Sequence, residues 1–191
     1  ALTLASKLLD KKKLQKILIV TSDNYTKNLD QNDRSVLPLF SDAATATIVS
    51  NAPGYLRIKE SYNHTVPNTI NDLIFSKIKN NYLIKMNGPE VLLFALKNVL
   101  PIFNKIIDRD KKVTIFVHQA SKIVLKKILN QIKKINSNNF APTNFSKIGN
   151  TVSSSLPILI NQNWTIFKKS KNVILAGFGV GLSYSFLKLK R

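Results

Sequence analysis

Short apolar runs alternate with stretches of helically spaced apolar residues along this chain, and this alternation predicts an α/β fold. Apolar residues recur at intervals of three and four in residues 1–9, 89–99, 121–132 and 151–164, which predicts four helices. Pro101 should kink or end the second helix before residues 102–107. Runs rich in β-branched residues predict strands at residues 17–20, 43–49, 113–117, 173–176 and 183–189.

The first two strand segments differ in their patterns. Residues 17–20 are continuously apolar, which predicts a strand buried on both faces. Residues 43–49 alternate and are rich in alanine, so we expect a central strand. Residues 51–81 carry two prolines, a glycine and many polar side chains, and they predict an edge hairpin with surface loops. His64, within that segment, is expected to be a solvated loop residue.

Two polar side chains stand where a helix begins. His118 follows the strand at 113–117 and precedes the helix at 121–132, while Asn150 follows a polar loop and precedes the helix at 151–164. A neutral imidazole and a carboxamide can each donate one hydrogen bond to the same substrate oxygen. The pair could therefore hold a developing enolate, although a lone histidine in a turn is more often an ordinary surface or capping residue.

Four sequence motifs carry a resemblance to a known family. They read HQAS at residues 118–121, GNTVSSSLP at 149–157, GFGVGLS at 177–183 and FSDAATA at 40–46. In this order they resemble the ketoacyl-ACP synthase III family of thiolase-like condensing enzymes. In the last motif this chain has Ser41, Ala43 and Thr45 where the family has glycine.

The resemblance implies a partial thiolase-like fold with α/β/α/β/α layers. Residues 1–85 would be the end of the N-terminal half, and residues 86–191 would be the C-terminal half. The chain opens in a helical pattern without an initiating Met or an N-cap residue. In the family the corresponding helix begins at the nucleophilic cysteine. We therefore expect a C-terminal fragment, with the nucleophile a few residues before Ala1.

The resemblance also implies a reaction and roles for particular residues. The reaction is an acyl transfer, in which an acyl thioester and malonyl-ACP undergo decarboxylative Claisen condensation. His118 and Asn150 would be the catalytic pair on the malonyl thioester. Phe178, Gly179 and Val180 would form the oxyanion and substrate loop. Because the 191 residues contain no cysteine, the chain alone is predicted to be inactive.

Basic residues of the helix that follows His118 would bind the acyl carrier protein in the family. The corresponding residues here are Gln119, Lys122, Lys126 and Lys127. Where the fatty-acid initiators of the family have an arginine five residues after the histidine, this chain has Ile123. The lysines can also be read simply as a solvated helix face.

Composition limits the classes of protein and partner. A chain of 191 residues with 44% hydrophobic residues is long enough for one domain with a core. The absence of cysteine excludes disulfides and thiolate metal sites from these residues. The net charge is +19, but only four of the 29 basic residues are Arg, and no aromatic platform is interleaved with them. We expect an acidic protein partner rather than nucleic acid.

The remaining expectations concern location, assembly and the alternative function. No apolar stretch reaches transmembrane length and no secretory signal is visible, so we expect a cytoplasmic protein without a membrane partner. No metal or cofactor is expected. The resemblance implies a homodimer, acyl carrier protein or coenzyme A thioesters as partners, and a role in fatty acid biosynthesis. The alternative is a non-catalytic thiolase-fold module that binds an acyl ligand or a protein.

Overall fold

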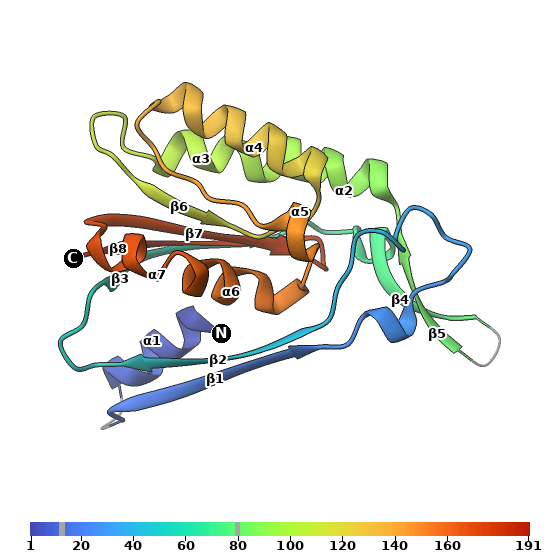
Figure 1. The fold of residues 1–191 in the computed structure, drawn as a ribbon, viewed down its shortest axis with the longest axis horizontal. Coiled ribbons are helices and arrows are strands. Elements are labelled where there is room, and N and C mark those ends of the chain that lie inside the picture. Colours follow the sequence, from blue (N-terminus) through green and yellow to red (C-terminus); the bar gives the residue numbers. More distant parts are fainter. Residues whose placement is uncertain (12–13, 79–80) are drawn as a thin grey trace.

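The computed structural model describes residues 1–11, 14–78 and 81–191. Its elements lie in successive layers: helices, a four-stranded sheet, a second set of helices and a two-stranded sheet (Figure 1). The predicted α/β class is thereby confirmed. None of the helices in the described ranges is both long and apolar enough to cross a membrane.

The four-stranded sheet positions two parts of the site: His118, which follows one of its strands, and Phe178, which lies near the end of another. Its strands run in the order β3-β8-β7-β6, with β6 parallel to β7 and the other two pairs antiparallel. All four residues of β6 are buried, because apolar residues of the helices pack on both faces of the sheet at this strand. The strands are β3 (Arg57–Thr65), β6 (Thr114–Val117), β7 (Asn172–Gly179) and β8 (Ser183–Lys190).

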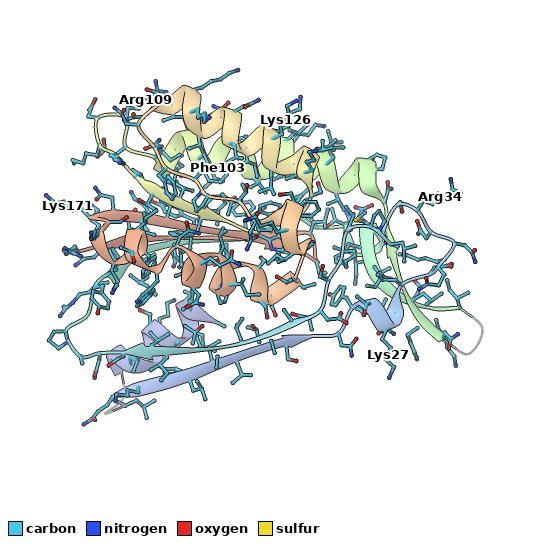
Figure 2. All side chains as sticks on the ribbon, in the orientation of Figure 1. Lys27, Arg34, Phe103, Arg109, Lys126 and Lys171 are labelled. Atoms are coloured by element: carbon cyan, nitrogen blue, oxygen red, sulfur yellow. The ribbon has the colours of Figure 1, made fainter. Side chains whose placement is uncertain are left out.

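One face of this sheet is covered by a helical layer. The layer comprises α2 (Gly88–Phe94), the π-helical turn η3 (Ala95–Val99), α3 (Leu100–Ile106) and α4 (Lys122–Ile135). Phe103 lies between this layer and the sheet, where its ring meets the edge of Phe186 at a centroid distance of 5.0 Å (Figure 2). Ile128 of α4 and Ile115 of β6 are buried in the same apolar cluster. The main core therefore lies between α3, α4 and the sheet.

Pro101 was expected to kink or end the helix that begins at Gly88; the helix does not end there, but its α-helical pattern is interrupted just before the proline. The chain stays helical from α2 to α3 and passes through the wider turns of η3 just before the proline. Proline lacks an N–H and clashes with the carbonyl four residues earlier. The π-helical turn removes the need for that hydrogen bond, and Pro101 then occupies the first turn of α3, where proline is tolerated.

The opposite face of the sheet carries a second set of helices. They are α1 (Leu2–Lys11), η4 (Val152–Ser154), α6 (Ser155–Gln162) and α7 (Trp164–Lys169). The helix predicted at 151–164 is therefore broken at Asn163. The side-chain amide of Asn163 donates to the Leu159 carbonyl at 2.9 Å. The backbone N–H of Asn163 donates to the Ile160 carbonyl instead, at 3.1 Å. A side chain that competes for a helical carbonyl in this way favours termination.

The strands β1 (Lys16–Asp23) and β2 (Ala43–Ser50) form a separate two-stranded antiparallel sheet. We expected β1 to be buried on both faces and β2 to be a central strand; in the described residues each pairs only with the other, and both predictions are wrong. Leu18 and Ile48 face each other across the ladder and are 60% and 67% exposed. The opposite face packs toward α1 and η4.

Residues 51–81 were expected to contain an edge hairpin, but they contain only its first strand, β4 (Leu73–Ile78), because the partner strand β5 (Asn81–Met86) begins where that segment ends, and the two strands form a separate sheet. The residues before β4 are not only loop, because β3 pairs with β8 at the edge of the four-stranded sheet. His64 lies on β3 rather than in a loop, and it is exposed as expected. The remaining short elements are η1 (Thr26–Asn28), η2 (Ile70–Asp72) and α5 (Phe145–Ile148).

The exposed apolar face of β1 and β2 should cause the 191-residue chain to self-associate, because apolar strands with open edges pair with one another. Leu18→Lys is expected to reduce this association, measured by sedimentation velocity over a range of protein concentrations. Ser22→Lys adds the same charge to the same exposed face without removing an apolar side chain. Equal association of the two variants would mean that charge alone, and not the apolar face, is responsible.

Candidate functional site

His118 lies at the turn that the sequence predicts. Strand β6 ends at Val117 and α4 begins at Lys122, with the Ser121 side chain accepting a hydrogen bond from a backbone N–H of the first helical turn. The His118 backbone N–H donates to the Ala176 carbonyl of β7 at 2.8 Å. This bond extends the pairing of β6 and β7 by one residue and holds the start of the turn against the sheet.

The His118 ring is held on two sides. Its Nδ1 lies 2.6 Å from the Ser155 hydroxyl, and the edge of the ring meets Phe178 at a centroid distance of 5.5 Å. Burial lowers the pKa of His118 from its usual 6.5 to about 4, because a charged ring would lose its hydration there. The ring is therefore neutral at pH 7. Within the described part of the chain, Nε2 has no hydrogen-bond partner.

Asn150 is held by the loop that carries the 40–46 motif. Its backbone N–H donates to the Leu39 carbonyl at 2.8 Å, and its carbonyl accepts from the Ser41 N–H at 2.9 Å. Its side-chain Oδ1 accepts from the Val152 N–H at 2.9 Å, and this bond turns the amide nitrogen to the other side. That nitrogen donates to the Ala120 carbonyl at 3.3 Å. Asn150 thus reaches the turn that contains His118, and one of its amide hydrogens is left for a ligand.

Gly149 makes this approach possible, although the sequence motif alone gave no reason to single it out. Its φ of 69° and ψ of −158° belong to a region that is essentially restricted to glycine. A Cβ at this position would lie 2.6 Å from the Ser41 Oγ and 3.0 Å from the Leu39 carbonyl oxygen. The glycine therefore lets the Asn150 segment approach the 40–46 motif closely.

Gln119 lies in the interior, with no exposed surface. Its amide nitrogen donates to the Val117 carbonyl at 2.7 Å, and its oxygen accepts from the backbone N–H groups of Asn144 and Phe145 at 3.0 and 3.2 Å. The side chain therefore ties the His118 turn to the loop that leads to Asn150. This position is not open to a carrier protein, and the contact that the resemblance implied for Gln119 would have to be made by neighbouring exposed residues.

The lysines of α4 are exposed. Lys122, Lys126 and Lys127 all lie on the solvent side of the helix, as does Ile123. Figure 2 shows Lys126 pointing away from the layer that contains Phe103. Other labelled basic residues, such as Lys171 and Lys27, lie on different sides of the molecule, so the positive charge is spread rather than gathered on one face.

The third predicted part of the site is the end of β7. Phe178 and Gly179 are its last two residues, so the glycine-rich turn is shorter than the sequence suggests and consists of Val180, Gly181 and Leu182. Phe178 meets the His118 ring, as described above. Val180 is 56% exposed, and no hydrogen bond in the described residues joins it to His118 or Asn150.

Three consecutive serines follow Asn150 in η4 and at the start of α6, and the sequence did not reveal their separate contacts. The hydroxyl and the backbone N–H of Ser153 donate to the Asp23 carboxylate. The Ser154 hydroxyl lies 2.8 Å from that of Thr21 on β1, and the Ser155 hydroxyl meets His118. In the sequence, these contacts are signalled by nothing more specific than a run of three small hydroxyl residues near the start of a predicted helix. Each serine contacts a different neighbour, which links the β1–β2 sheet to the His118 turn.

The side chains of His118 and Asn150 can together stabilise negative charge on an oxygen atom. Two neutral nitrogen groups, Nε2 of His118 and the amide of Asn150, can each present one N–H in a largely buried site lined by the Phe178 ring. Such donors stabilise negative charge that develops on a carbonyl oxygen without adding a full positive charge. The described residues contain no cluster of His, Cys, Asp or Glu that could hold a metal ion.

Two family models match the chain in sequence order. The model for 3-oxoacyl-[acyl-carrier-protein] synthase III matches residues 1–65, and the model for the C-terminal part of that synthase matches residues 108–190. The chain belongs to the 3-oxoacyl-[acyl-carrier-protein] synthase III family. The resemblance carried by the four sequence motifs is confirmed.

Curated relatives bear the same name. The chain is 28% identical over 207 residues to the beta-ketoacyl-[acyl-carrier-protein] synthase III of Streptococcus agalactiae, a match that covers 100% of this chain and 64% of the relative. It is 30% identical over 203 residues to the synthase III of Enterococcus faecalis, covering 99% of this chain and 63% of the relative. The chain thus spans slightly less than two thirds of the length of these relatives.

Solved structures confirm the thiolase-like fold class. A crystal structure of a 3-oxoacyl-(acyl-carrier-protein) synthase III superposes with a TM-score of 0.85 at 27% identity, covering 100% of this chain and 64% of that one. The priming beta-ketosynthase of the R1128 polyketide pathway superposes with a TM-score of 0.85 at 21% identity over 99% of this chain and 61% of its own. At that identity the second match shows the fold alone. The division into halves at residue 85 stays a prediction.

Proposed function

We propose that this chain supplies the carbanion-forming half of a ketoacyl-ACP synthase III site. In this proposal a malonyl thioester binds with its thioester carbonyl against His118 and Asn150. Loss of carbon dioxide then generates a carbon nucleophile that attacks an acyl thioester. The synthase III family to which the chain belongs and the names of its curated relatives support this reaction class and a role in fatty acid biosynthesis.

The observation that carries the proposal is the convergence of two neutral donors on one turn. His118 and Asn150 are 32 positions apart in the sequence, yet the Asn150 amide donates to Ala120, whose own N–H donates to the His118 carbonyl at 3.0 Å. Each side chain uses its other polar atom in an internal bond, Nδ1 with Ser155 and Oδ1 with Val152. This arrangement leaves one N–H of each side chain available to a ligand, and we propose that both donate to the same substrate oxygen.

The chemistry requires neutral donors of this kind. When the bond between the malonyl α-carbon and its carboxylate breaks, the electron pair moves into an enolate whose negative charge lies on the thioester oxygen. Two N–H groups can hold that oxygen, and each donor is worth about 3 to 4 kcal/mol in comparable oxyanion holes. The α-carbon of the enolate then attacks the acyl carbonyl, and the thiolate that carried the acyl group leaves. Carbon dioxide is the other product.

The acyl group would be carried by a cysteine that is not among these 191 residues. Ser155 is the hydroxyl residue that contacts His118, but it is buried with 1% of its surface exposed, so we propose that it does not replace the cysteine. We therefore propose that the chain alone forms no acyl-enzyme. The loss of three family glycines, at Ser41, Ala43 and Thr45, keeps the alternative of a non-catalytic binding module open to test.

We also propose that the exposed lysines of α4 guide an acidic carrier protein to this site. Lys122, Lys126 and Lys127 lie on the helix that begins at the His118 turn, and opposite charges steer association. Gln119 has no part in this contact, because its side chain is buried. Ile123, where the fatty-acid initiators have arginine, leaves an exposed apolar side chain among these lysines.

A condensation assay on the product of the complete gene tests both proposals. We expect ketoacyl product and carbon dioxide from an acyl thioester together with either malonyl-CoA or a malonyl carrier protein. The triple variant of Lys122, Lys126 and Lys127 to Glu should raise KM for the carrier-bound substrate by roughly tenfold or more at low salt and leave malonyl-CoA unaffected.

The control is the triple variant of Lys168, Lys169 and Lys171 to Glu, which changes the net charge equally at a different place, around the end of α7. If both triple variants raise KM alike, net charge and not docking on α4 explains the effect. If neither malonyl substrate yields carbon dioxide or ketoacyl product, the protein is the binding module and not a synthase.

A further inference from the structure

We propose that Ser155 is a positioning residue that donates its hydroxyl hydrogen to Nδ1 of His118 and thereby keeps the ring proton on Nε2. This inference deepens the proposed function, on which its catalytic consequence rests. None of the four motif resemblances assigned a role to Ser155. Its role follows from its contact in the structure, where the Ser155 Oγ and the His118 Nδ1 are 2.6 Å apart.

The direction of this hydrogen bond can be argued from the surroundings of Ser155. The residue is buried, with 1% of its surface exposed, and His118 is the one partner of its hydroxyl in the described part of the chain. If Nδ1 carried the proton and donated, the serine hydroxyl would still have a hydrogen to place, and it would be buried without an acceptor. Burying an unsatisfied donor costs about 1 to 3 kcal/mol. The hydroxyl therefore donates and Nδ1 accepts.

This direction determines which ring nitrogen faces a substrate as a donor. A neutral imidazole carries one proton, so an accepting Nδ1 leaves the proton on Nε2. Nε2 is the nitrogen that has no partner among the described residues. Phe178 packs against the ring from β7, so the ring is held by a hydrogen bond on one side and by an aromatic contact on another. The tautomer required for a neutral donor is thus present before substrate binds.

The preceding serine provides a matched control. Ser154 is also fully buried, but its hydroxyl lies 2.8 Å from Thr21 and 3.4 Å from the Ala43 carbonyl, and it does not contact His118. Ser154→Ala and Ser155→Ala therefore remove the same atom from adjacent buried positions. Only the second change should alter the imidazole.

Nitrogen NMR of protein labelled with ¹⁵N-histidine tests the tautomer without any turnover. The signals of His118 are those that vanish in His118→Ala. We expect the wild-type spectrum at pH 7 to show a protonated Nε2 and an unprotonated, hydrogen-bonded Nδ1. Ser155→Ala should shift the Nδ1 signal toward that of an unbonded nitrogen or produce a second tautomer, and Ser154→Ala should leave it in place. A proton on Nδ1 in the wild type would overturn the proposal, even if neither variant could be folded.

Kinetics of carbon dioxide release from malonyl-CoA then test the catalytic consequence. Ser155→Ala should lower kcat by about tenfold with a smaller change in KM, since one hydrogen bond that orients the donor is lost. Ser154→Ala should keep kcat near that of the wild type. Equal losses in the two variants would overturn the positioning role. Correct tautomer signals in a wild-type protein that releases no carbon dioxide would instead contradict the proposed function.

Discussion

His118→Ala and Asn150→Ala are each expected to slow carbon dioxide release from malonyl-CoA by about 10²- to 10³-fold, the loss typical of removing one oxyanion-hole donor. Each substitution leaves the enolate oxygen with a single partner in a largely buried site. Because the two N–H groups act on the same oxygen, the double variant should lose less than the product of the two single losses.

Acyl transfer to the nucleophile should be affected far less by either substitution. The proposed roles divide the reaction: His118 and Asn150 serve the malonyl half, and backbone N–H groups near Val180 serve the acyl oxyanion. The measurement compares radiolabelled acyl loading with carbon dioxide release for the product of the complete gene. His64→Ala is the control, because His64 is the other histidine of the chain and lies exposed on β3, separated from Phe178 of β7 by Tyr184 of β8. If His118→Ala blocked loading as severely as decarboxylation, His118 would have to be the base that activates the thiol.

The pH dependence provides a separate readout of the same assignment. The pKa of His118 is lowered to about 4, so the ring stays neutral from pH 7 down to pH 5. Carbon dioxide release should therefore not fall with a midpoint near 6.5, the usual pKa of histidine. The free energy of unfolding should fall between pH 6.5 and about 4, because His118 takes up a proton there in the unfolded chain but not in the folded one. Above pH 6.5 this contribution does not change. A midpoint near 6.5 that disappears in His118→Ala would mean that the working ring is solvated.

Gly149→Ala is expected to reduce the free energy of unfolding by on the order of 2 to 4 kcal/mol. Backbone strain at its φ and ψ contributes about 1 to 3 kcal/mol, and the contact of a Cβ with the Leu39 carbonyl oxygen adds to it. Because Asn150 is the next residue, any relief of this clash would displace its amide. Decarboxylation should therefore fall as well, even at temperatures where the variant is folded.

Denaturant unfolding and carbon dioxide release, both measured on Gly149→Ala and on Gly54→Ala, check this expectation. Gly54 is the matched control, since a Cβ built there meets no atom closer than the Ala52 carbonyl oxygen at 3.8 Å and its φ is not positive. We expect the control to unfold close to the wild-type midpoint. An unchanged midpoint for Gly149→Ala would show that the contact between residues 39–41 and 149–150 is looser than the structure describes.

The elements nearest to the site could be predicted well because their signals are local. The β-branched run before His118 and the helical spacing after Ser121 are set by the two side-chain periods of strand and helix. Ser121, where the predicted helix begins, is the N-cap residue of α4, which starts at Lys122. Positions of strands, helices and the two polar turns follow from such short-range patterns, and the ordered motifs were sufficient to identify the family.

Local patterns did not predict the contacts that join distant segments. The continuous apolar run of β1 and the alternation of β2 could not reveal that Leu18 and Ile48 share an exposed face, since exposure depends on what packs above the strand. Gln119 is polar and follows a candidate catalytic residue, so the sequence places it on a partner surface. In the structure its amide oxygen instead accepts hydrogen bonds from the backbone N–H groups of residues 144 and 145. Buried polar side chains of this kind are determined by their neighbours in space.

By itself, the sequence determined the α/β class and the family, and it pointed to His118 and Asn150 as candidate donors, because side-chain type and spacing carry that information directly. Only the tertiary structure decided what those donors can do. The approach of residues 39–41 to Asn150 turns its amide toward Ala120, and the contact of Ser155 with His118 selects one ring nitrogen. The physical reason is that hydrogen-bond direction, burial and pKa depend on atoms brought together across 30 to 130 positions of chain, which no local pattern encodes.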